Sequence, residues 1–187
     1  LLVQYDPDPD AVASALAMRT LLGRNKLSAP IATFGKVTRP ENLAMLKLLD
    51  IEVNRIGLEE LDEYNRIVLL DVQPSHFREE LPPVHVIIDH HPENENAVCL
   101  FKDIRPNYGA TSTILQEYLH AGDVKITQKL ATALLYGIKT DTLLLEREAI
   151  ENDLRAFSIL YPMANHRLIR RMERPQLPKE DLSVLSK

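Results

Sequence analysis

One apolar run constrains this chain more than any other feature, because it ends abruptly in two histidines. Residues 86–92 read Val-Ile-Ile-Asp-His-His-Pro, a segment with strand character that stops at Asp89, His90 and His91. In an open parallel sheet, ligands bind outside the carboxyl ends of the strands. A carboxylate and two imidazoles at such an end therefore predict a binding site.

Other apolar runs also end in acidic side chains. Residues 1–5 lead into Asp8 and Asp10, residues 67–70 lead into Asp71, and Asp141 ends another apolar segment. Each aspartate alone has a structural explanation as a helix cap or turn residue. Together they favour a metal site, because mixed carboxylate and imidazole ligands suit Mn²⁺, Mg²⁺, Fe²⁺ or Zn²⁺. Two metals about 3.5–4 Å apart activate a water for phosphoryl displacement, so phosphoester hydrolysis is the predicted reaction class.

The alternation of strand-like and helical segments predicts the fold class. Strands are predicted at residues 1–5, 30–34, 53–56, 66–71, 84–89 and 97–101. Helices are predicted at residues 9–22, 40–49, 110–121, 127–139 and 151–160, with a short helical turn at 58–64. This order is typical of an α/β protein with a mostly parallel, Rossmann-like sheet and helices on both faces.

Composition excludes several classes of protein. With 187 residues and 45% hydrophobic residues, the chain is long enough for one well-packed domain. Its net charge of −5 argues against a broadly basic surface that coats nucleic acid. The single cysteine, Cys99, cannot form an intrachain disulfide, which suits a reducing compartment. No apolar run approaches the ~20 residues of a membrane span, so we predict a cytoplasmic protein without a membrane partner.

The chain changes character after residue 160, where prolines punctuate a charged stretch. We therefore predict a catalytic domain at residues 1–160, followed by a helix and linker at residues 161–187. Four arginines in this stretch have helical spacing: Arg167, Arg170, Arg171 and Arg174. This spacing favours a solvated face, with a phosphate-contacting patch as the alternative.

These residues resemble the motifs of the DHH phosphoesterase superfamily, which is named for a triplet found here at Asp89-His90-His91. Other segments that are similar to its motifs are residues 7–11, Asp71, residues 109–113 and residues 135–142. Residues 39–42, Arg-Pro-Glu-Asn, are similar to the nanoRNase-like branch. The resemblance covers most of the chain and implies a DHH domain.

The resemblance implies a two-metal site with Mn²⁺, or with Mg²⁺ as the alternative. The implied ligands are Asp8 and Asp71 for the first ion, and Asp10, Asp71, His90 and Asp141 for the second. His91 is implied to face the scissile phosphate, while Asp89 orients its neighbours. Ser112 and Thr113 are implied to help position the site or to bind substrate.

Two departures from the family pattern alter these expectations. The first motif normally begins with a metal-binding histidine four residues before its first aspartate, and this chain has Gln4 there. An amide oxygen is a poorer ligand than imidazole for a transition metal, so we expect weak binding at the first position, or a single ion. Relatives also carry a C-terminal substrate-binding domain of the DHHA1 type, which we expect to be missing from this sequence.

Three functions remain open at this point. The leading hypothesis is a metal-dependent phosphodiesterase of the nanoRNase or RecJ type, an exonuclease acting on short oligonucleotides or small nucleotides. The second keeps the metals but changes the substrate to pyrophosphate or polyphosphate. The third is a degenerate, regulatory nucleotide-binding module, which Gln4 favours. Exposed strand edges also suggest a homo-oligomer.

Overall fold

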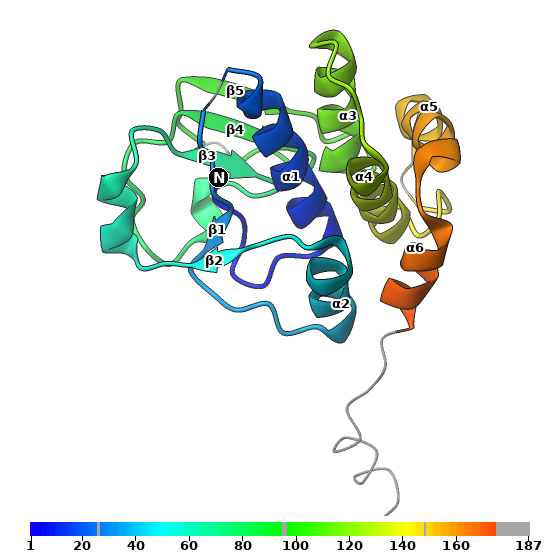
Figure 1. Ribbon diagram of the computed structural model, residues 1–187. Helices are drawn as coiled ribbons and strands as arrows, with labels where there is room; N and C mark the ends of the chain where they lie inside the picture. Colours follow the sequence, from blue (N-terminus) through cyan, green and yellow to red (C-terminus); the bar gives the residue numbers. More distant parts are fainter. Residues whose placement is uncertain (26, 95–96, 148, 175–187) are drawn as a thin grey trace, which may run out of the picture.

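A parallel sheet forms the centre of the computed structural model, which describes residues 1–25, 27–94, 97–147 and 149–174 (Figure 1). Its strands are β1 (Ala32–Thr33), β2 (Asn54–Arg55), β3 (Val68–Leu70), β4 (Val86–Asp89) and β5 (Phe101–Ile104). Every pairing between these strands is parallel. Leu2 bridges to Ala32 on one side and to Leu69 on the other, so it joins the two groups of strands.

The order across the sheet places a ligand crevice at a defined point. It runs β2, β1, the Leu2 segment, β3, β4 and β5. From Leu2 the chain moves outward to β2, then returns and moves outward through β3 to β5 on the other side. Ligands bind at such a reversal, outside the carboxyl ends of the strands. The segment after Leu2 and the residue after β3 therefore meet at the crevice.

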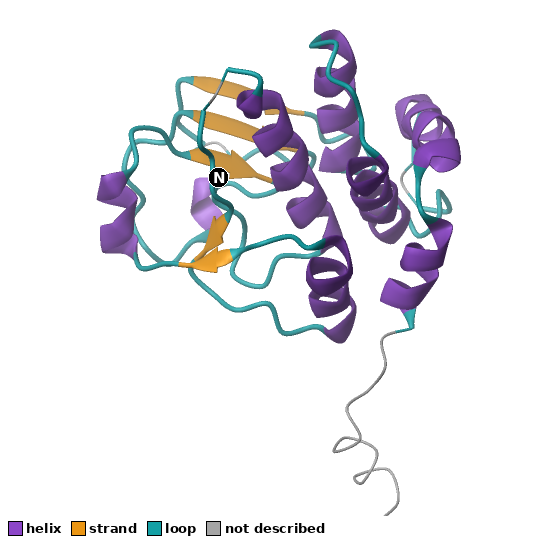
Figure 2. Cartoon of the chain, viewed as in Figure 1, coloured by secondary structure: helices purple, strands orange, loops and turns teal. Residues whose placement is uncertain are grey.

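The α-helices gather on one face of the sheet, and shorter helices cover the other (Figures 1 and 2). The α-helices are α1 (Pro9–Gly23), α2 (Pro40–Leu49), α3 (Thr111–Ala121), α4 (Gln128–Asp141), α5 (Glu151–Leu160) and α6 (His166–Glu173). They share the larger hydrophobic core with one face of the sheet. The 3-10 helices η1 (Leu58–Glu63) and η2 (Pro74–His76) adjoin the smaller core on the opposite face, through residues such as Leu61 and Phe77. The predicted fold class, with helices on both faces, is confirmed.

Local sequence signals set the ends of α1. Asp8 is the N-cap, and its carboxylate accepts a hydrogen bond from the Ala11 backbone N–H at 2.9 Å. Pro9 occupies the first turn, where its missing N–H costs nothing. The helix ends at Gly23, one residue beyond the predicted range. Capping chemistry was therefore readable from the sequence, because it depends only on neighbouring residues.

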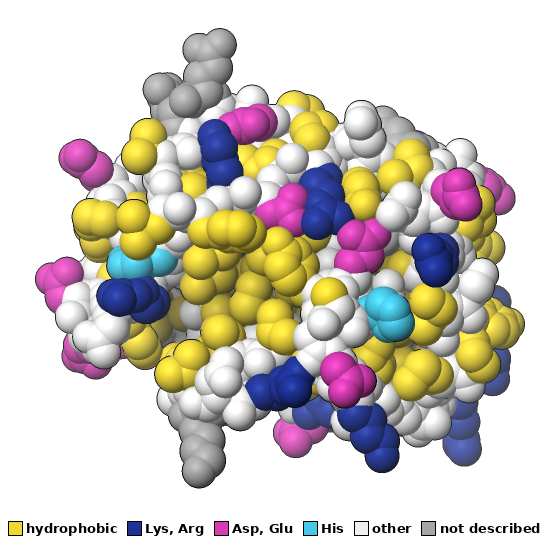
Figure 3. All heavy atoms as spheres, turned by 90° about the horizontal axis from the view of Figure 1, so that it is seen from above, with side chains coloured by type: hydrophobic (Ala, Val, Ile, Leu, Met, Phe, Trp, Pro, Cys, Tyr) yellow, Lys and Arg dark blue, Asp and Glu magenta, His cyan; other side chains and the backbone are white. Residues whose placement is uncertain are grey.

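One predicted strand is displaced. An apolar run suggested a strand at residues 97–101, but β5 starts at Phe101 and continues to Ile104. Val98 is 80% exposed and Leu100 is 83% exposed, so this run is not a buried strand. β5 is an edge strand of the sheet. Seen from above, the molecule has hydrophobic side chains gathered in the middle of its surface (Figure 3). The strand predicted from apolar content was misplaced, because exposed apolar residues also occur in loops.

The segment after residue 160 contains the predicted helix. The short 3-10 helix η3 (Tyr161–Met163) leads into α6, whose Ile169 and Met172 are buried in the larger core. The four arginines of this segment are exposed, in agreement with a solvated face. The linker predicted after the helix lies mostly in residues 175–187, outside the described residues. Among the described helices, none is both long enough and apolar enough to cross a membrane.

Candidate metal centre

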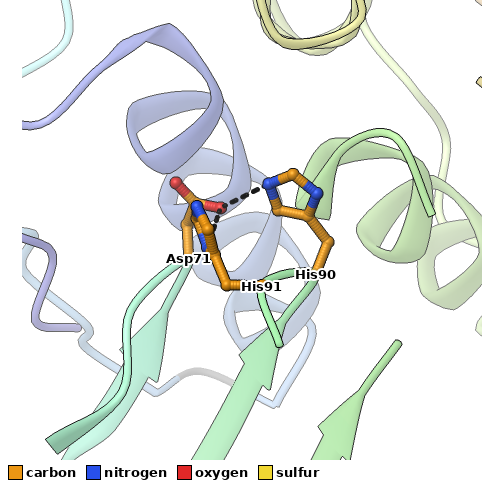
Figure 4. Close-up of side chains that lie close together, drawn as sticks. All are labelled: Asp71, His90 and His91. Carbon is orange, nitrogen blue, oxygen red and sulfur yellow. Dashed lines mark ion pairs between the residues drawn. The ribbon is translucent and has the colours of Figure 1, made fainter. Parts of the chain in front are cut away.

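The centre of the site lies at the carboxyl ends of β3 and β4. Asp71 follows β3 directly, and His90 and His91 follow β4. Figure 4 shows these three side chains turned toward one another above the two strand ends. His90 Nε2 lies 3.6 Å from Asp71 Oδ1, and His91 Nδ1 lies 3.9 Å from the same oxygen. The neighbouring parallel strands thus bring together residues that are 19 and 20 positions apart.

Asp71 is a buried carboxylate with an unsatisfied oxygen. Its backbone has a φ of 60°, in the left-handed region that few residues other than glycine, asparagine and aspartate adopt. Oδ1 accepts a hydrogen bond from Thr111 Oγ1 at 2.8 Å, whereas Oδ2 is buried and has no hydrogen-bond partner among the described residues. Burial, followed by the charges of Asp10 and Asp8, raises the pKa of Asp71 well above its usual value. A bound cation would reverse this penalty.

Asp10 reaches the site from the first turn of α1 and meets the N-terminus of α3. Its two oxygens accept hydrogen bonds from the backbone N–H groups of Thr111 at 2.7 Å and Ser112 at 2.8 Å. The partial positive charge of a helix N-terminus favours a carboxylate there. Burial and the charge of Asp141 nevertheless raise the pKa of Asp10 to about 7.

Gly137, in α4, permits the close packing around Asp10. A Cβ atom at this position would lie 2.6 Å from Ser112 Oγ and 3.0 Å from Asp10 Oδ1, both too close. Glycine is therefore required where α4 passes the N-termini of α1 and α3. Gly137 belongs to the motif-like residues 135–142, but the sequence alone assigns it no role.

His90 presents one ring nitrogen to the cluster, and its other nitrogen is fixed from behind. Nδ1 lies 3.0 Å from the Tyr108 carbonyl oxygen. Because a carbonyl only accepts hydrogen bonds, Nδ1 must carry the proton, and Nε2 of the neutral ring keeps a free lone pair. Nε2 lies 3.1 Å from Asp141 Oδ2. Burial lowers the pKa of His90, but Asp141 and the charge of Asp10 outweigh it and raise the pKa to about 9.

Asp141 comes from a helix end rather than a strand end. It is the last residue of α4, whereas the sequence placed it beyond a helix predicted to end at residue 139. The C-terminal end of a helix carries partial negative charge, which disfavours a carboxylate. The position therefore gains from a positive partner, which His90 supplies in part.

These residues fit a divalent metal. Asp10, His90 and Asp141 each offer a ligand atom within 4.8 Å of the others, and so do Asp71, His90 and His91. Asp71 Oδ2 is buried without a hydrogen-bond partner among the described residues, and the buried His90 Nε2 lies beside the carboxylates of Asp71 and Asp141. Buried polar atoms are otherwise almost always paired. We call Asp10, Asp71, His90 and Asp141 the inner cluster.

Asp8, the remaining expected ligand, lies in a different environment from the inner cluster. Asp8 accepts a hydrogen bond from Ala11 N–H through Oδ1 and a second, at 3.1 Å, from Gln4 Nε2 through Oδ2. Asp8 belongs to neither group of convergent ligand atoms. Burial and the charge of Asp141 raise its pKa. We call Gln4 and Asp8 the outer pair; its metal-binding role stays a prediction.

His91 is held by a buried carboxylate beside the cluster. Asp89 accepts a hydrogen bond from His91 Nδ1 at 2.8 Å and another from Gln73 Nε2 at 2.7 Å. Burial raises the pKa of Asp89, but these hydrogen bonds outweigh it, and the pKa is lowered. The hydrogen bond to Asp89 in turn raises the pKa of His91. Since Nδ1 is engaged, Nε2 is the atom that can meet a substrate phosphate.

Gln73 and Asp153 are supporting residues whose roles were not predicted from the sequence. Gln73 is buried, and besides Asp89 it contacts the backbone of Pro92 and Asn94. Asp153 is buried and accepts a hydrogen bond from Gly109 N–H at 2.9 Å. Both reach the site across long sequence separations, although Asp153 also accepts a hydrogen bond from Ile150 N–H at 2.9 Å at the start of α5.

Ser112 and Thr113 lie inside the domain rather than at its surface. Both are completely buried. Ser112 N–H donates to Asp10, and Thr113 Oγ1 donates to Asp153 at 2.5 Å. These contacts support the inner cluster from the α3 side. Direct substrate binding by the two residues stays a prediction.

Comparison with known proteins adds family context to this geometry. The DHH family N-terminal domain matches residues 1–138. An uncharacterized protein of Methanocaldococcus jannaschii is 37% identical over 188 residues, covering 100% of this chain and 39% of that protein. A probable manganese-dependent inorganic pyrophosphatase of Lactobacillus helveticus is 28% identical over 170 residues, covering 86% of this chain and 53% of that protein. This chain therefore spans about half or less of these relatives.

A solved structure has the same fold. It is an exopolyphosphatase-related protein from Bacteroides fragilis, with a TM-score of 0.75 and 18% sequence identity. The alignment covers 99% of this chain and 58% of that one. At this identity the likeness concerns the fold, and it spans the whole region described above.

Proposed function

Because this chain belongs to the DHH family, we propose that it is the metal-binding part of a phosphohydrolase that uses a divalent metal, with Mn²⁺ as the ion. One observation carries the proposal. Asp71 Oδ2 is buried without a hydrogen-bond partner among the described residues, and Asp71 belongs to a group of three side chains whose ligand atoms converge. A divalent cation is the partner that this arrangement lacks.

Each side chain has a proposed role. The inner cluster would hold the metal, and Asp71 would also serve as a ligand of a second ion. When bound, a divalent metal polarises a phosphoryl oxygen and lowers the pKa of a bound water. His91 Nε2 faces the scissile phosphate, while Asp89 keeps the His91 ring in place through its 2.8 Å hydrogen bond. Burial of Asp10 and Asp71 excludes water from the ligands.

The bond that is cleaved is either a phosphoanhydride or a phosphodiester. The names of the curated pyrophosphatase relatives support inorganic pyrophosphate or polyphosphate. The similarity of residues 39–42 to the nanoRNase-like branch supports short oligonucleotides or small nucleotides. Both substrates carry a negatively charged phosphoryl group, and a metal held by the inner cluster suits either. Location in the cytoplasm and a homo-oligomeric state remain predictions.

Metal titration and hydrolysis assays test this proposal together. Calorimetry with Mn²⁺ should show at least one binding event on the metal-free chain. Pyrophosphate, tripolyphosphate, a 5′-phosphorylated dinucleotide and bis-p-nitrophenyl phosphate are then offered at saturating Mn²⁺. Release of phosphate from pyrophosphate alone would assign anhydride hydrolysis, and cleavage of the dinucleotide would assign diester hydrolysis. No Mn²⁺ binding would contradict the proposal.

A regulatory binding module is the second candidate, and the outer pair favours it. Gln4 Nε2 donates to Asp8, so the first expected metal position is filled by a hydrogen bond inside the protein. A chain that binds one Mn²⁺ and a dinucleotide without turnover would support this alternative. Turnover by the chain with Gln4 intact would exclude it.

A further inference from the structure

A polar network lies behind His90, on the side away from the inner cluster, and the proposed function does not use it. It links β5, the following turn, α3 and α5. We propose that Arg105 is a positioning residue for His90: it clamps the turn whose Tyr108 carbonyl oxygen fixes the His90 ring. The inference rests on the proposed function, because it takes His90 as a metal ligand.

Arg105 uses its guanidinium group to join three side chains. Nε and Nη2 donate to the two oxygens of Asp103 at 2.8 and 2.6 Å. Nη1 donates to Glu117 Oε2 at 2.5 Å and to the Tyr108 hydroxyl at 3.0 Å. Such a fork of planar donors is specific to arginine, and lysine cannot reproduce it. The side chain therefore ties the end of β5 to α3 and to the turn.

The turn itself is held at both ends. Arg105 N–H donates to the Asp89 carbonyl oxygen at 2.9 Å, which fixes the start of the turn beside the DHH triplet. Tyr108 N–H donates to the Arg105 carbonyl oxygen at 3.0 Å and closes the turn. The Tyr108 hydroxyl meets Glu117 at 3.1 Å and Asn152 at 3.0 Å. The Tyr108 carbonyl oxygen is left facing His90 Nδ1 at 3.0 Å.

The charge balance of the network makes Arg105 its key member. Asp103 and Glu117 are both anionic, and the guanidinium is the cation placed between them. Without it the two carboxylates lose their shared partner, and the Tyr108 hydroxyl loses one of its contacts. Partners that orient a metal-binding histidine typically change metal affinity 10–100-fold when they are removed. A purely structural tie would instead change only the stability of the fold.

Variants of Arg105 and Tyr118 separate the two roles. Arg105→Gln removes the cation and the fork, whereas Tyr118→Phe removes a 2.8 Å hydrogen bond to Asp103 and leaves the cation, its fork and Tyr108 in place. Mn²⁺ affinity is measured by calorimetry, and unfolding is followed by melting. We expect Arg105→Gln to weaken Mn²⁺ binding about 10–100-fold, and Tyr118→Phe to leave it within about twofold. Unchanged Mn²⁺ affinity in folded Arg105→Gln would overturn the inference.

A second readout does not depend on metal. Exchange of the His90 Nδ1 proton with solvent, followed by NMR on the metal-free chain, should become about tenfold faster in Arg105→Gln if the Tyr108 hydrogen bond weakens. It should stay unchanged in Tyr118→Phe. If Arg105→Gln does not fold, Arg105→Lys and Tyr108→Phe take its place, and normal Mn²⁺ affinity and proton exchange in both would overturn the inference. Failure of the parent chain to bind Mn²⁺ would instead contradict the proposed function, while the exchange measurement would still test the positioning of His90.

Discussion

Asp71 of the inner cluster and Asp8 of the outer pair are carboxylates in opposite situations. In the inner cluster, Asp71 Oδ2 is buried without a hydrogen-bond partner among the described residues, and His90 Nε2 faces the carboxylates of Asp71 and Asp141. In the outer pair, both oxygens of Asp8 are occupied, one by the Ala11 N–H and one by Gln4 Nε2. A carboxylate at the end of a strand or the start of a helix is therefore not a metal ligand by itself. Whether such a carboxylate lacks a partner depends on the hydrogen-bond donors around it.

This difference has a consequence for metal binding. The inner cluster contains three aspartates, and burial and mutual repulsion raise the pKa of Asp10 and Asp71. A divalent ion relieves both penalties, so its binding is strengthened. At Asp8 an ion must displace the Gln4 hydrogen bond or share the same oxygen. We therefore expect one tight and one weak Mn²⁺ event.

The largest effect is expected from Asp71→Asn, which removes the carboxylate that faces both histidines. Asparagine tolerates the left-handed backbone at this position, so the turn is retained. Mn²⁺ affinity should fall by at least about 100-fold, because a charged ligand is lost. The metal-free variant should melt at the same temperature as the parent or higher, since a buried, disfavoured carboxylate is gone. Calorimetry and melting in chelator measure these effects, and retained tight binding would remove Asp71 from the site.

The second effect concerns the pH dependence of the metal-free fold. The pKa of Asp10 is raised to about 7, against about 4 for an unfolded aspartate. Between these values the folded state holds the extra proton, so the free energy of unfolding decreases as pH rises toward 7. The pKa of His90, raised to about 9, extends the decrease above its usual 6.5.

Melting in chelator at pH 5.5 and pH 8.5 checks this prediction. The melting temperature should drop by about 5 °C between the two. Asp10→Asn should reduce the drop, and saturating Mn²⁺ should raise the melting temperature more at pH 8.5 than at pH 5.5, since protons compete with the metal. A melting temperature that increases with pH would contradict the assignment of raised pKa values to the inner cluster.

A third prediction sharpens the contrast at the outer pair. Gln4→His restores the imidazole that the family pattern places before the first aspartate. The weaker Mn²⁺ event should tighten about tenfold, because imidazole is the better ligand for a transition metal. Gln4→Leu is the matched control: it removes the hydrogen bond to Asp8 without adding a ligand. If both variants bind Mn²⁺ as the parent does, the outer pair has no part in metal binding.

The smallest effect is expected at Asp8, where capping and metal binding can be separated. Asp8→Ala should lower the free energy of unfolding by about 1 kcal/mol, because the Ala11 N–H loses its acceptor. Asp8→Ser keeps a capping oxygen and should be nearly as stable as the parent. Both should weaken only the weaker Mn²⁺ event. Loss of the tight event in Asp8→Ser would move Asp8 into the inner cluster.

Much of the fold was predictable because its signals are local. Asp8 and Pro9 predicted the start of α1, and the apolar runs before Asp71 and Asp89 predicted β3 and β4. Residues 97–101 misled the prediction, since Val98 is exposed although it belongs to an apolar run. Apolar content does not reveal whether other parts of the molecule pack against a residue.

The candidate site was predictable in its residue types and less so in its connections. The sequence pointed to Asp10, Asp71, His90 and Asp141, and the structure brings these four together. The hydrogen bond between Gln4 and Asp8 was not foreseen. A side chain's partner depends on its rotamer and on the packing around it.

The sequence by itself determined the ends of β3 and β4, the cap of α1 and the identities of the candidate ligands. These depend on residues only a few positions apart, where backbone geometry leaves few choices. The tertiary structure alone decided that Asp10 meets the N-terminus of α3, and that Asp141 reaches His90 from the end of α4. It also placed the Tyr108 carbonyl oxygen behind His90. Such contacts join residues far apart in the chain, so they depend on how the helices pack against the sheet.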